Sequence, residues 1–194
     1  MELTEKYKQE QEDTIKRNFQ YRRNYISSPR FYTLAAFCEP FKAILSVGCG
    51  SYEPILIKAT MAVDVSPLAS FFLKRLGFSH SFLTASCDNL PLPDKSFDVA
   101  VCSEVIEHLP DLETIQKTFY ELDRVAHNWV VTTPCNPIGP LNTEPTHKRA
   151  FTFAELEELI SFTQAKIYKD NQFYWVVKDV TQTFWEIFNK YNKG

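Results

Sequence analysis

The sequence predicts a single-domain α/β fold with a doubly wound, mostly parallel sheet, a C-terminal β-hairpin and helices on both faces. The apolar, β-branched run at residues 43–47 ends in a Gly-Cys-Gly turn at residues 48–50, which is typical of a buried parallel strand entering a tight turn. A second strand follows at residues 60–65, with Asp64 near its carboxyl end. In doubly wound sheets, a glycine turn after one strand and a carboxylate after the next bind a nucleoside. The glycines let the backbone approach the ligand, and the carboxylate accepts hydrogen bonds from the ribose hydroxyls.

Length, composition and charge are those of one ordinary soluble domain. A hydrophobic fraction of 44% in 194 residues is enough to bury a substantial core. The net charge of -3 gives the chain no overall basic field for nucleic acid. No apolar run reaches the ~18 residues of a membrane span, and the polar N-terminus does not resemble a signal peptide. The five cysteines have no C-x-x-C spacing, so we expect reduced thiols in a cytoplasmic protein.

The N-terminal part, residues 1–40, is expected to form a helical cap. Residues 2–25 are strongly charged and helix-like, with interleaved basic and aromatic side chains. One interpretation is an amphipathic helix that packs its aromatic residues on the domain; the other is a lid over the ligand or a surface for an anionic substrate. A second short helix is predicted over residues 31–37, ending near Pro40. The interleaved residues are Lys16, Arg17, Phe19, Tyr21, Arg22, Arg23 and Tyr25.

The first half of the domain is predicted to contain three strands with short connections. Because Pro54 stands where the first helix should begin, only a stub near residues 54–59 fits before the second strand. A helix over residues 67–75 follows, with Gly77 suited to its C-cap. A third strand is predicted over residues 80–84.

The second half alternates strands with helices and ends in a hairpin. Thr152 and Glu155 form a capping box at the start of one helix. Residues 180–194 form an amphipathic segment, for which packing on the domain and a dimer contact are the alternatives. The expected elements are a proline-restrained loop at 89–93, strand 98–102, helix 111–125, strand 129–133, helix 153–161 and hairpin strands 165–169 and 173–178.

Several of these motifs together resemble the Rossmann-like, class I S-adenosylmethionine-dependent methyltransferases. The resembling group has a Glu-Val-Ile-Glu-His-Leu stretch after strand four, as at residues 104–109 here. The resemblance implies a seven-stranded sheet, an S-adenosylmethionine-binding domain over residues 41–178, and a C-terminal extension of it over 179–194. It implies methyl transfer to an O or N nucleophile of an acceptor, for which we favour a small molecule. The matching segments are residues 44–51, Asp64, 90–93 and 97–111.

The resemblance also assigns residues to the cofactor. Asp64 is expected to accept hydrogen bonds from the ribose hydroxyls. The turn residues Gly48, Cys49 and Gly50 are expected to line the methionine and ribose side through backbone groups. The remaining residues implied for cofactor binding are Val65, Ser86, Cys87, Asp88 and Ser103.

The sequence departs from the family pattern around the cofactor. Ser46 stands where the family usually has an acid, two residues before the first glycine, and Tyr52 replaces a third glycine. The segment from the turn to Asp64 is also short, so these changes alter the expected contacts with the methionine ammonium and carboxylate. Ser86 occupies the place of an adenine-binding aspartate. Either Asp88 substitutes for it, which we favour, or Ser86 and the backbone of Cys87 bind the base.

Glu104, Glu107 and His108 form an E-x-x-E-H set, which a helical turn would place on one face. His147 belongs to a long loop, residues 134–150, that is expected to fold back over the same place. In one interpretation His108 or His147 is the general base for the acceptor, with Glu104 as a further catalytic candidate. In the other, the four residues Glu104, Glu107, His108 and His147 hold a divalent metal, as in the small-RNA 3′-end 2′-O-methyltransferases that this quartet resembles. We favour the metal-free interpretation.

Two alternatives remain beside a small-molecule methyltransferase. One is a metal-assisted RNA ribose 2′-O-methyltransferase, against which the net negative charge weighs. The other is a non-catalytic methyltransferase-like binding module, which the altered methionine-side motif favours. An NAD-dependent oxidoreductase does not fit, because the turn lacks the third spaced glycine of that fingerprint. The sequence leaves the acceptor and the oligomeric state open.

Overall fold

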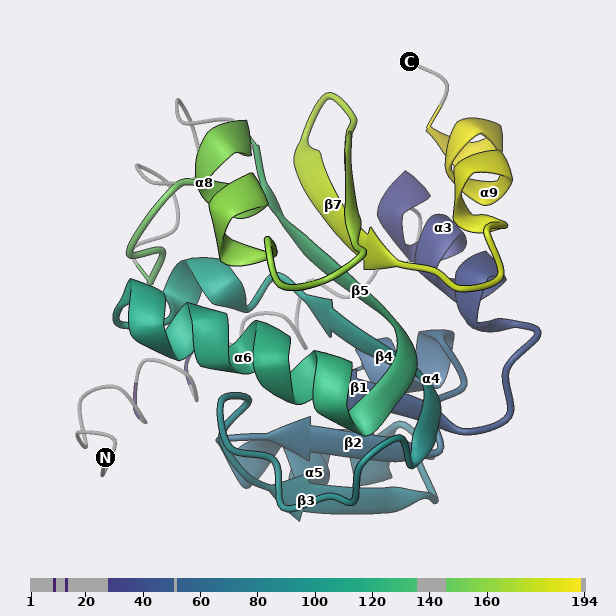
Figure 1. Ribbon diagram of the computed structural model, residues 1–194. Helices are drawn as coiled ribbons and strands as arrows, with labels where there is room; N and C mark the ends of the chain where they lie inside the picture. Colours follow the sequence, from purple (N-terminus) through teal and green to yellow (C-terminus); the bar gives the residue numbers. More distant parts are fainter. Residues whose placement is uncertain (1–8, 10–12, 14–27, 51, 136–145, 193–194) are drawn as a thin grey trace.

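The computed structural model describes residues 9, 13, 28–50, 52–135 and 146–192, and within them it contains one seven-stranded sheet (Figure 1). The strand order is β3-β2-β1-β4-β5-β7-β6. The first five strands run parallel, and β7 pairs antiparallel with both β5 and β6. This order confirms the predicted fold. The strands are β1 (Ile44–Val47), β2 (Met61–Asp64), β3 (Ser81–Thr84), β4 (Phe97–Ser103), β5 (Ala126–Pro134), β6 (Lys166–Lys169) and β7 (Phe173–Lys178).

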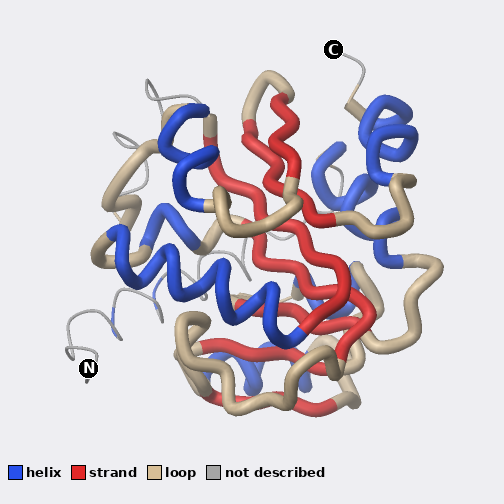
Figure 2. Tube along the Cα trace, viewed as in Figure 1, coloured by secondary structure: helices blue, strands red, loops and turns tan. Residues whose placement is uncertain are grey.

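Helices cover both faces of the sheet (Figure 2). Helices α6 and α8 pack on one face, while α3, α5 and α9 pack on the other together with the residues around α4. The crossover from β3 to β4 contains no helix and is drawn as a loop in Figure 2. The helices are α3 (Pro29–Cys38), α4 (Glu53–Leu56), α5 (Leu68–Arg75), the 3-10 turn η1 (Ile106–His108), α6 (Leu112–Val125), α8 (Phe153–Leu159) and α9 (Phe184–Tyr191).

The two faces of the sheet have separate hydrophobic cores because successive strand residues point to opposite faces. In β4, Val99 and Val101 belong to the core under α3 and α9, whereas Ala100 and Cys102 belong to the core under α6 and α8. By the same alternation Ser46 shares the α3 face with its neighbour Ile44, and it is fully buried.

Local signals in the sequence place several helix ends. Asp111 caps α6 by accepting a hydrogen bond from the N–H of Thr114 at 2.8 Å, and Thr152 and Glu155 form the predicted capping box of α8. The short helix after the glycine turn is confirmed as a stub, although α4 begins one residue earlier and ends sooner than predicted. The chain then turns sharply, with the N–H of Ala59 donating to the carbonyl of Pro54 at 2.7 Å.

The C-terminal helix α9 packs against α3. Phe184 and Phe188 are buried, and Phe184 makes an edge contact with Phe37 of α3 at 5.2 Å between ring centroids. The side-chain amide of Asn192 donates to Thr33 Oγ1 at 2.9 Å. Most of the helix predicted over residues 2–25, and residues 136–145 of the long loop, lie outside the described residues. Within the described part of the chain, no helix has the length and apolar character to span a bilayer.

Candidate active site

The turn after β1 lies at the edge of the sheet where the parallel strands end. Between β1 and β4 the winding of the sheet changes direction, and doubly wound sheets bind their ligands at this point. Gly48 and Gly50 have φ angles of 66° and 55°, in the left-handed region that favours glycine. A Cβ on Gly48 would lie 2.4 Å from Cγ2 of Val105. The predicted turn therefore packs directly against the segment that follows β4.

Asp64 lies at the end of β2 and is bonded to this turn. Its Oδ2 accepts from the N–H of Gly50 at 3.0 Å, and its Oδ1 accepts from the N–H of Ser66 at 2.9 Å. Burial raises the pKa of the Asp64 carboxyl to about 6, while these backbone hydrogen bonds lower it. Cys49 is buried with its Sγ 3.9 Å from Oδ2, and Val65 follows half-buried. The structure thus gathers the residues predicted at the first two strand ends.

The residues after β3 form one small hydrogen-bonded unit. Ser86 Oγ donates to Oδ1 of Asp88, and both residues are half-buried. The side chain of Cys87 packs into the core and accepts a hydrogen bond from Thr118 Oγ1 at 3.4 Å, which leaves its backbone for a ligand contact. The two alternatives for an adenine contact therefore lie in the same three residues, where Ser86 orients the carboxylate of Asp88.

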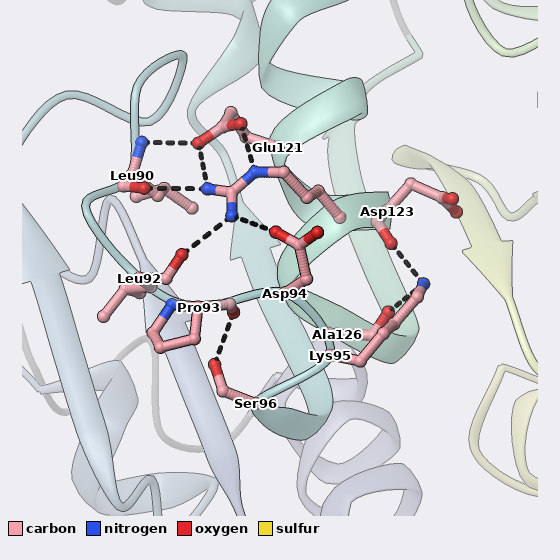
Figure 3. Close-up of polar contacts among 10 residues, drawn as sticks. Leu90, Leu92, Pro93, Asp94, Lys95, Ser96, Glu121, Asp123 and Ala126 are labelled. Atoms are coloured by element: carbon pink, nitrogen blue, oxygen red, sulfur yellow. Dashed lines mark hydrogen bonds and ion pairs between the residues drawn. The ribbon is translucent and has the colours of Figure 1, made fainter.

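Arg124 fastens the loop after this unit to α6 (Figure 3), and the sequence analysis did not foresee it. Its Nη2 donates to the carbonyl of Leu90 at 2.8 Å, and its Nη1 donates to the carbonyl of Leu92 and to Asp94 Oδ1, both at 2.7 Å. Glu121 accepts from Nε at 2.7 Å and from Nη2 at 2.8 Å, and its Oε2 also accepts from the N–H of Leu90 at 2.6 Å. All five N–H donors of the guanidinium are used.

Glu53, the first residue of α4, is a buried acid that the sequence analysis also missed. Ser46 Oγ donates to Glu53 Oε1 at 2.8 Å, and Glu53 is only 8% exposed. Burial raises the pKa of the Glu53 carboxyl to about 8, although hydrogen bonds from Ser46 and Ser103 and the charge of Arg30 lower it. Ser103 lies at the end of β4, where its hydroxyl bonds with Thr132 Oγ1 at 2.8 Å. A carboxyl group thus lies beside the position where the acid was expected.

Glu104 is outside the group of ligand atoms that Glu107, His108 and His147 form among the described residues, although burial and the charge of Glu104 raise the pKa of Glu107. It has a φ of 58° and precedes the 3-10 turn, so it does not share a helical face with Glu107 and His108. Its Oε2 pairs with Arg30 Nη1 at 3.1 Å, and its Oε1 accepts from Thr132 Oγ1 at 3.2 Å. Burial raises the pKa of the Glu104 carboxyl, and Arg30 opposes that shift.

The other three predicted residues, Glu107, His108 and His147, do come together. One ligand atom of each lies within 4.8 Å of the others, and the two imidazole rings meet edge-on at 4.7 Å. Thr133 Oγ1 donates to Oε2 of the buried Glu107 at 3.1 Å. Oε1 of Glu107 has no hydrogen-bond partner within the described part of the chain. His108 Nδ1 lies 3.1 Å from the carbonyl of Thr146. Three of the four residues could therefore hold a divalent cation.

The fold is shared with solved methyltransferase structures. An S-adenosylmethionine-dependent methyltransferase of Thermotoga maritima, described as a possible histamine N-methyltransferase, matches with a TM-score of 0.62 at 18% identity, over 83% of this chain and 95% of that one. The 1,6-didemethyltoxoflavin-N1-methyltransferase of Burkholderia thailandensis, solved with S-adenosylhomocysteine, matches with a TM-score of 0.62 at 12% identity, over 91% and 90%. The TM-scores show a common fold, and at identities this low the likeness shows the fold alone.

The sequence itself matches a family described as a methyltransferase domain over residues 45–128. A probable S-adenosylmethionine-dependent methyltransferase of Mycobacterium tuberculosis is 30% identical over 152 residues, which cover 74% of this chain and 54% of that relative. This chain contains a methyltransferase domain of the Rossmann-like, S-adenosylmethionine-dependent family. It spans between 34% and 54% of the length of the curated relatives that it matches.

The residues of this methyltransferase fit the cofactor of its family. A fixed carboxylate suits the ribose hydroxyls of S-adenosylmethionine, and the Asp64 carboxylate is held in place by the N–H of Gly50, in a turn whose glycines admit close approach. It also has positive charges on its sulfonium and ammonium groups. The same edge of the sheet holds two buried carboxyl groups, on Glu53 and Glu107, a half-buried one on Glu104, and one buried guanidinium, on Arg30. This excess of acidic groups favours a cationic ligand.

Proposed function

We propose that this methyltransferase transfers the methyl group of S-adenosylmethionine to an O or N nucleophile of a small-molecule acceptor. The observation that carries the proposal is the glycine turn bonded to Asp64 at the point where the sheet changes direction. The cofactor supplies a sulfonium methyl that is already activated, so the protein has mainly to align the acceptor and exclude water.

The residues at the strand ends divide the binding of the cofactor among them. Asp64 accepts hydrogen bonds from the ribose hydroxyls, and Asp88, oriented by Ser86, accepts the adenine amino hydrogen. The turn residues contribute backbone groups on the ribose and methionine side. The remaining proposed cofactor contacts are made by Gly48, Cys49, Gly50, Val65, the backbone of Cys87, and Ser103.

The acceptor loses a proton to the histidine pair. The carbonyl of Thr146 can only accept, so a neutral His108 carries its proton on Nδ1 and presents the lone pair of Nε2. His147 lies at 4.7 Å between ring centroids and is the second candidate for this base. Glu104, the further catalytic candidate, pairs with Arg30 and is not the base in this proposal. Proton removal assists transfer to a hydroxyl or amine that sheds its proton late.

The decisive test is titration calorimetry with S-adenosylmethionine and S-adenosylhomocysteine. We expect Asp64→Ala to weaken both ligands about 10- to 100-fold, because charge-assisted hydrogen bonds to the ribose are lost. Asp98→Ala is the matched control, since Asp98 Oδ2 also accepts two backbone hydrogen bonds, from Lys42 at 2.9 Å and Ala43 at 2.8 Å, where β4 begins. A folded protein that binds neither ligand would instead be the non-catalytic module.

A divalent-metal reaction on an RNA ribose is the second candidate, and the grouping of Glu107, His108 and His147 favours it. It requires that Mn²⁺ bind the wild type and that His147→Ala or Glu107→Gln abolish this binding. It also requires that a chelator stop methylation. The net charge of -3 favours a small acceptor over RNA.

The five free, buried cysteines support a cytoplasmic location.

A further inference from the structure

Two buried ionisable side chains come from separate helices, α3 and α4, which contact each other, and α4 also contacts β1. Arg30 comes from α3 and is 6% exposed, and Glu53 comes from α4 and is 8% exposed. Their charges interact, since the guanidinium lowers the pKa of the Glu53 carboxyl. Ser46 Oγ, at the end of β1, donates to Glu53 Oε1 at 2.8 Å. Three elements that are distant in sequence therefore meet at this place.

Neither charge is fully matched by the protein itself. Arg30 Nη1 pairs with Glu104 at 3.1 Å, but Arg30 Nε has no hydrogen-bond partner within the described residues. Glu53 forms no ion pair in the same part of the chain, and hydroxyl groups are its hydrogen-bonding neighbours. Burying a charged group without a full set of partners is costly. A buried carboxyl group without a cationic partner, next to a guanidinium with a spare donor, is complementary to the ammonium and carboxylate of a zwitterion.

The position of this pair points to one part of the cofactor. Glu53 follows the glycine turn in sequence, and Ser46 precedes it by two residues. Cys49 of the turn is buried with its Sγ 3.9 Å from Asp64 Oδ2, and burial and the carboxyl groups of Asp64 and Glu53 raise the pKa of its thiol. The turn therefore lies near both Asp64, which is proposed to bind the ribose, and Glu53. The cofactor needs this arrangement, because its ribose and its amino-acid end must be bound at the same time.

We propose that Glu53 and Arg30 form a clamp for the amino-acid end of the cofactor, in which Glu53 binds the ammonium and Arg30 Nε helps to bind the carboxylate. This inference rests on the proposed function. It accounts for one departure on the methionine side: the acid missing at Ser46 is supplied by Glu53, which hydrogen-bonds to that serine. A guanidinium is the side chain best suited to a carboxylate.

The test uses three adenosine ligands that differ only at this end. S-adenosylhomocysteine carries both the ammonium and the carboxylate, its decarboxylated analogue carries the ammonium alone, and 5′-methylthioadenosine carries neither. Calorimetry of Glu53→Gln should show at least tenfold weaker binding of the first two ligands and unchanged binding of the third. Arg30→Gln should weaken S-adenosylhomocysteine by at least fivefold and leave the other two unchanged. Unchanged binding of 5′-methylthioadenosine also serves as the control for folding.

A double variant tests directly whether Glu53 takes the place of an acid at position 46. In Ser46→Asp with Glu53→Ser the carboxylate returns to β1, and we expect S-adenosylhomocysteine to regain most of the affinity lost in Glu53→Gln. If Glu53→Gln weakens all three ligands equally, the residue acts through the fold and the clamp is wrong. If the wild type binds all three ligands and neither single variant discriminates among them, the clamp is wrong while the proposed function stands. If the wild type binds none of the three ligands, both the clamp and the proposed function are wrong.

Discussion

Arg124 and Arg30 each join segments that are distant in sequence, but only Arg124 has a partner for every donor. Arg124 uses its five N–H groups on two backbone carbonyls and two carboxylates, and the loop from Leu90 to Asp94 is held by them. Arg30 makes one ion pair and keeps a buried Nε without a partner in the described residues. The first network is complete without a ligand, and the second is not.

The environments of the two arginines sharpen this difference. Arg124 is 32% exposed, so water screens its charges and its contribution comes chiefly from geometry. Arg30 is 6% exposed and lies between the rings of Phe31 and Phe173, at 4.8 and 4.7 Å from the guanidinium carbon. Incomplete pairing is tolerable at the surface and costly in the interior. The incompletely paired guanidinium of the buried Arg30 is therefore suited to binding a charged ligand.

The largest loss of stability at a fixed pH is expected from removing Arg124. Arg124→Ala leaves two carbonyls and Glu121 without their donors, and we expect a loss of about 3 kcal/mol in the free energy of unfolding. Because the loop follows Asp88, binding of 5′-methylthioadenosine should weaken too. Urea unfolding and calorimetry measure both. Arg124→Lys should recover little, since an ammonium cannot reproduce the planar set of five donors.

Arg30→Gln should differ from Arg124→Ala in which ligands it weakens. It should leave 5′-methylthioadenosine binding unchanged and weaken only a ligand with a carboxylate. If Arg124→Ala and Arg30→Gln weaken 5′-methylthioadenosine alike, the distinction between a structural and a ligand-binding arginine fails.

The next effect is a pH dependence of stability that Glu53 confers. Its folded-state pKa of about 8 lies above the ordinary value of 4.5, so the folded protein holds a proton that the unfolded chain releases. Stability from this group is fully present below pH 4.5 and is lost as the pH rises towards 8, by up to about 1.4 kcal/mol per pH unit. Thermal unfolding of the ligand-free protein should show this decline, and Glu53→Gln should flatten it. An equal decline in Glu53→Gln would assign it to other groups.

Local signals made most of the fold predictable. The run before Gly48 alternates between two buried faces, and the positive φ angles of Gly48 and Gly50 are conformations that glycine favours. Capping residues such as Thr152 act within four residues of their own position, so sequence spacing alone reveals them. Asp64 was predictable for a similar reason, because its place at a strand end fixes its neighbours.

The unpredicted features depend on contacts between distant elements. Glu53 is notable only when Ser46 of β1 lies beside it, and Arg30 only when α3 returns to the sheet. Glu104 does not share a helical face with Glu107 and His108, because it has a φ of 58° and the 3-10 turn begins only at Ile106; a positive φ at a residue other than glycine cannot be read from spacing. The pair Glu121 and Arg124, three residues apart on a helix, was a visible signal, but its target in the loop was not.

The smallest effect is expected from the outermost member of the Arg124 network. Asp94 is 75% exposed, so we expect Asp94→Asn to change the free energy of unfolding by no more than about 0.5 kcal/mol. Glu121→Gln is the matched comparison, because Glu121 is 17% exposed and accepts from both Arg124 and the Leu90 N–H; we expect a loss of about 1 to 2 kcal/mol. Urea unfolding of both variants measures the ratio. Equal losses would mean that net charge, not the geometry of the donors, holds this loop.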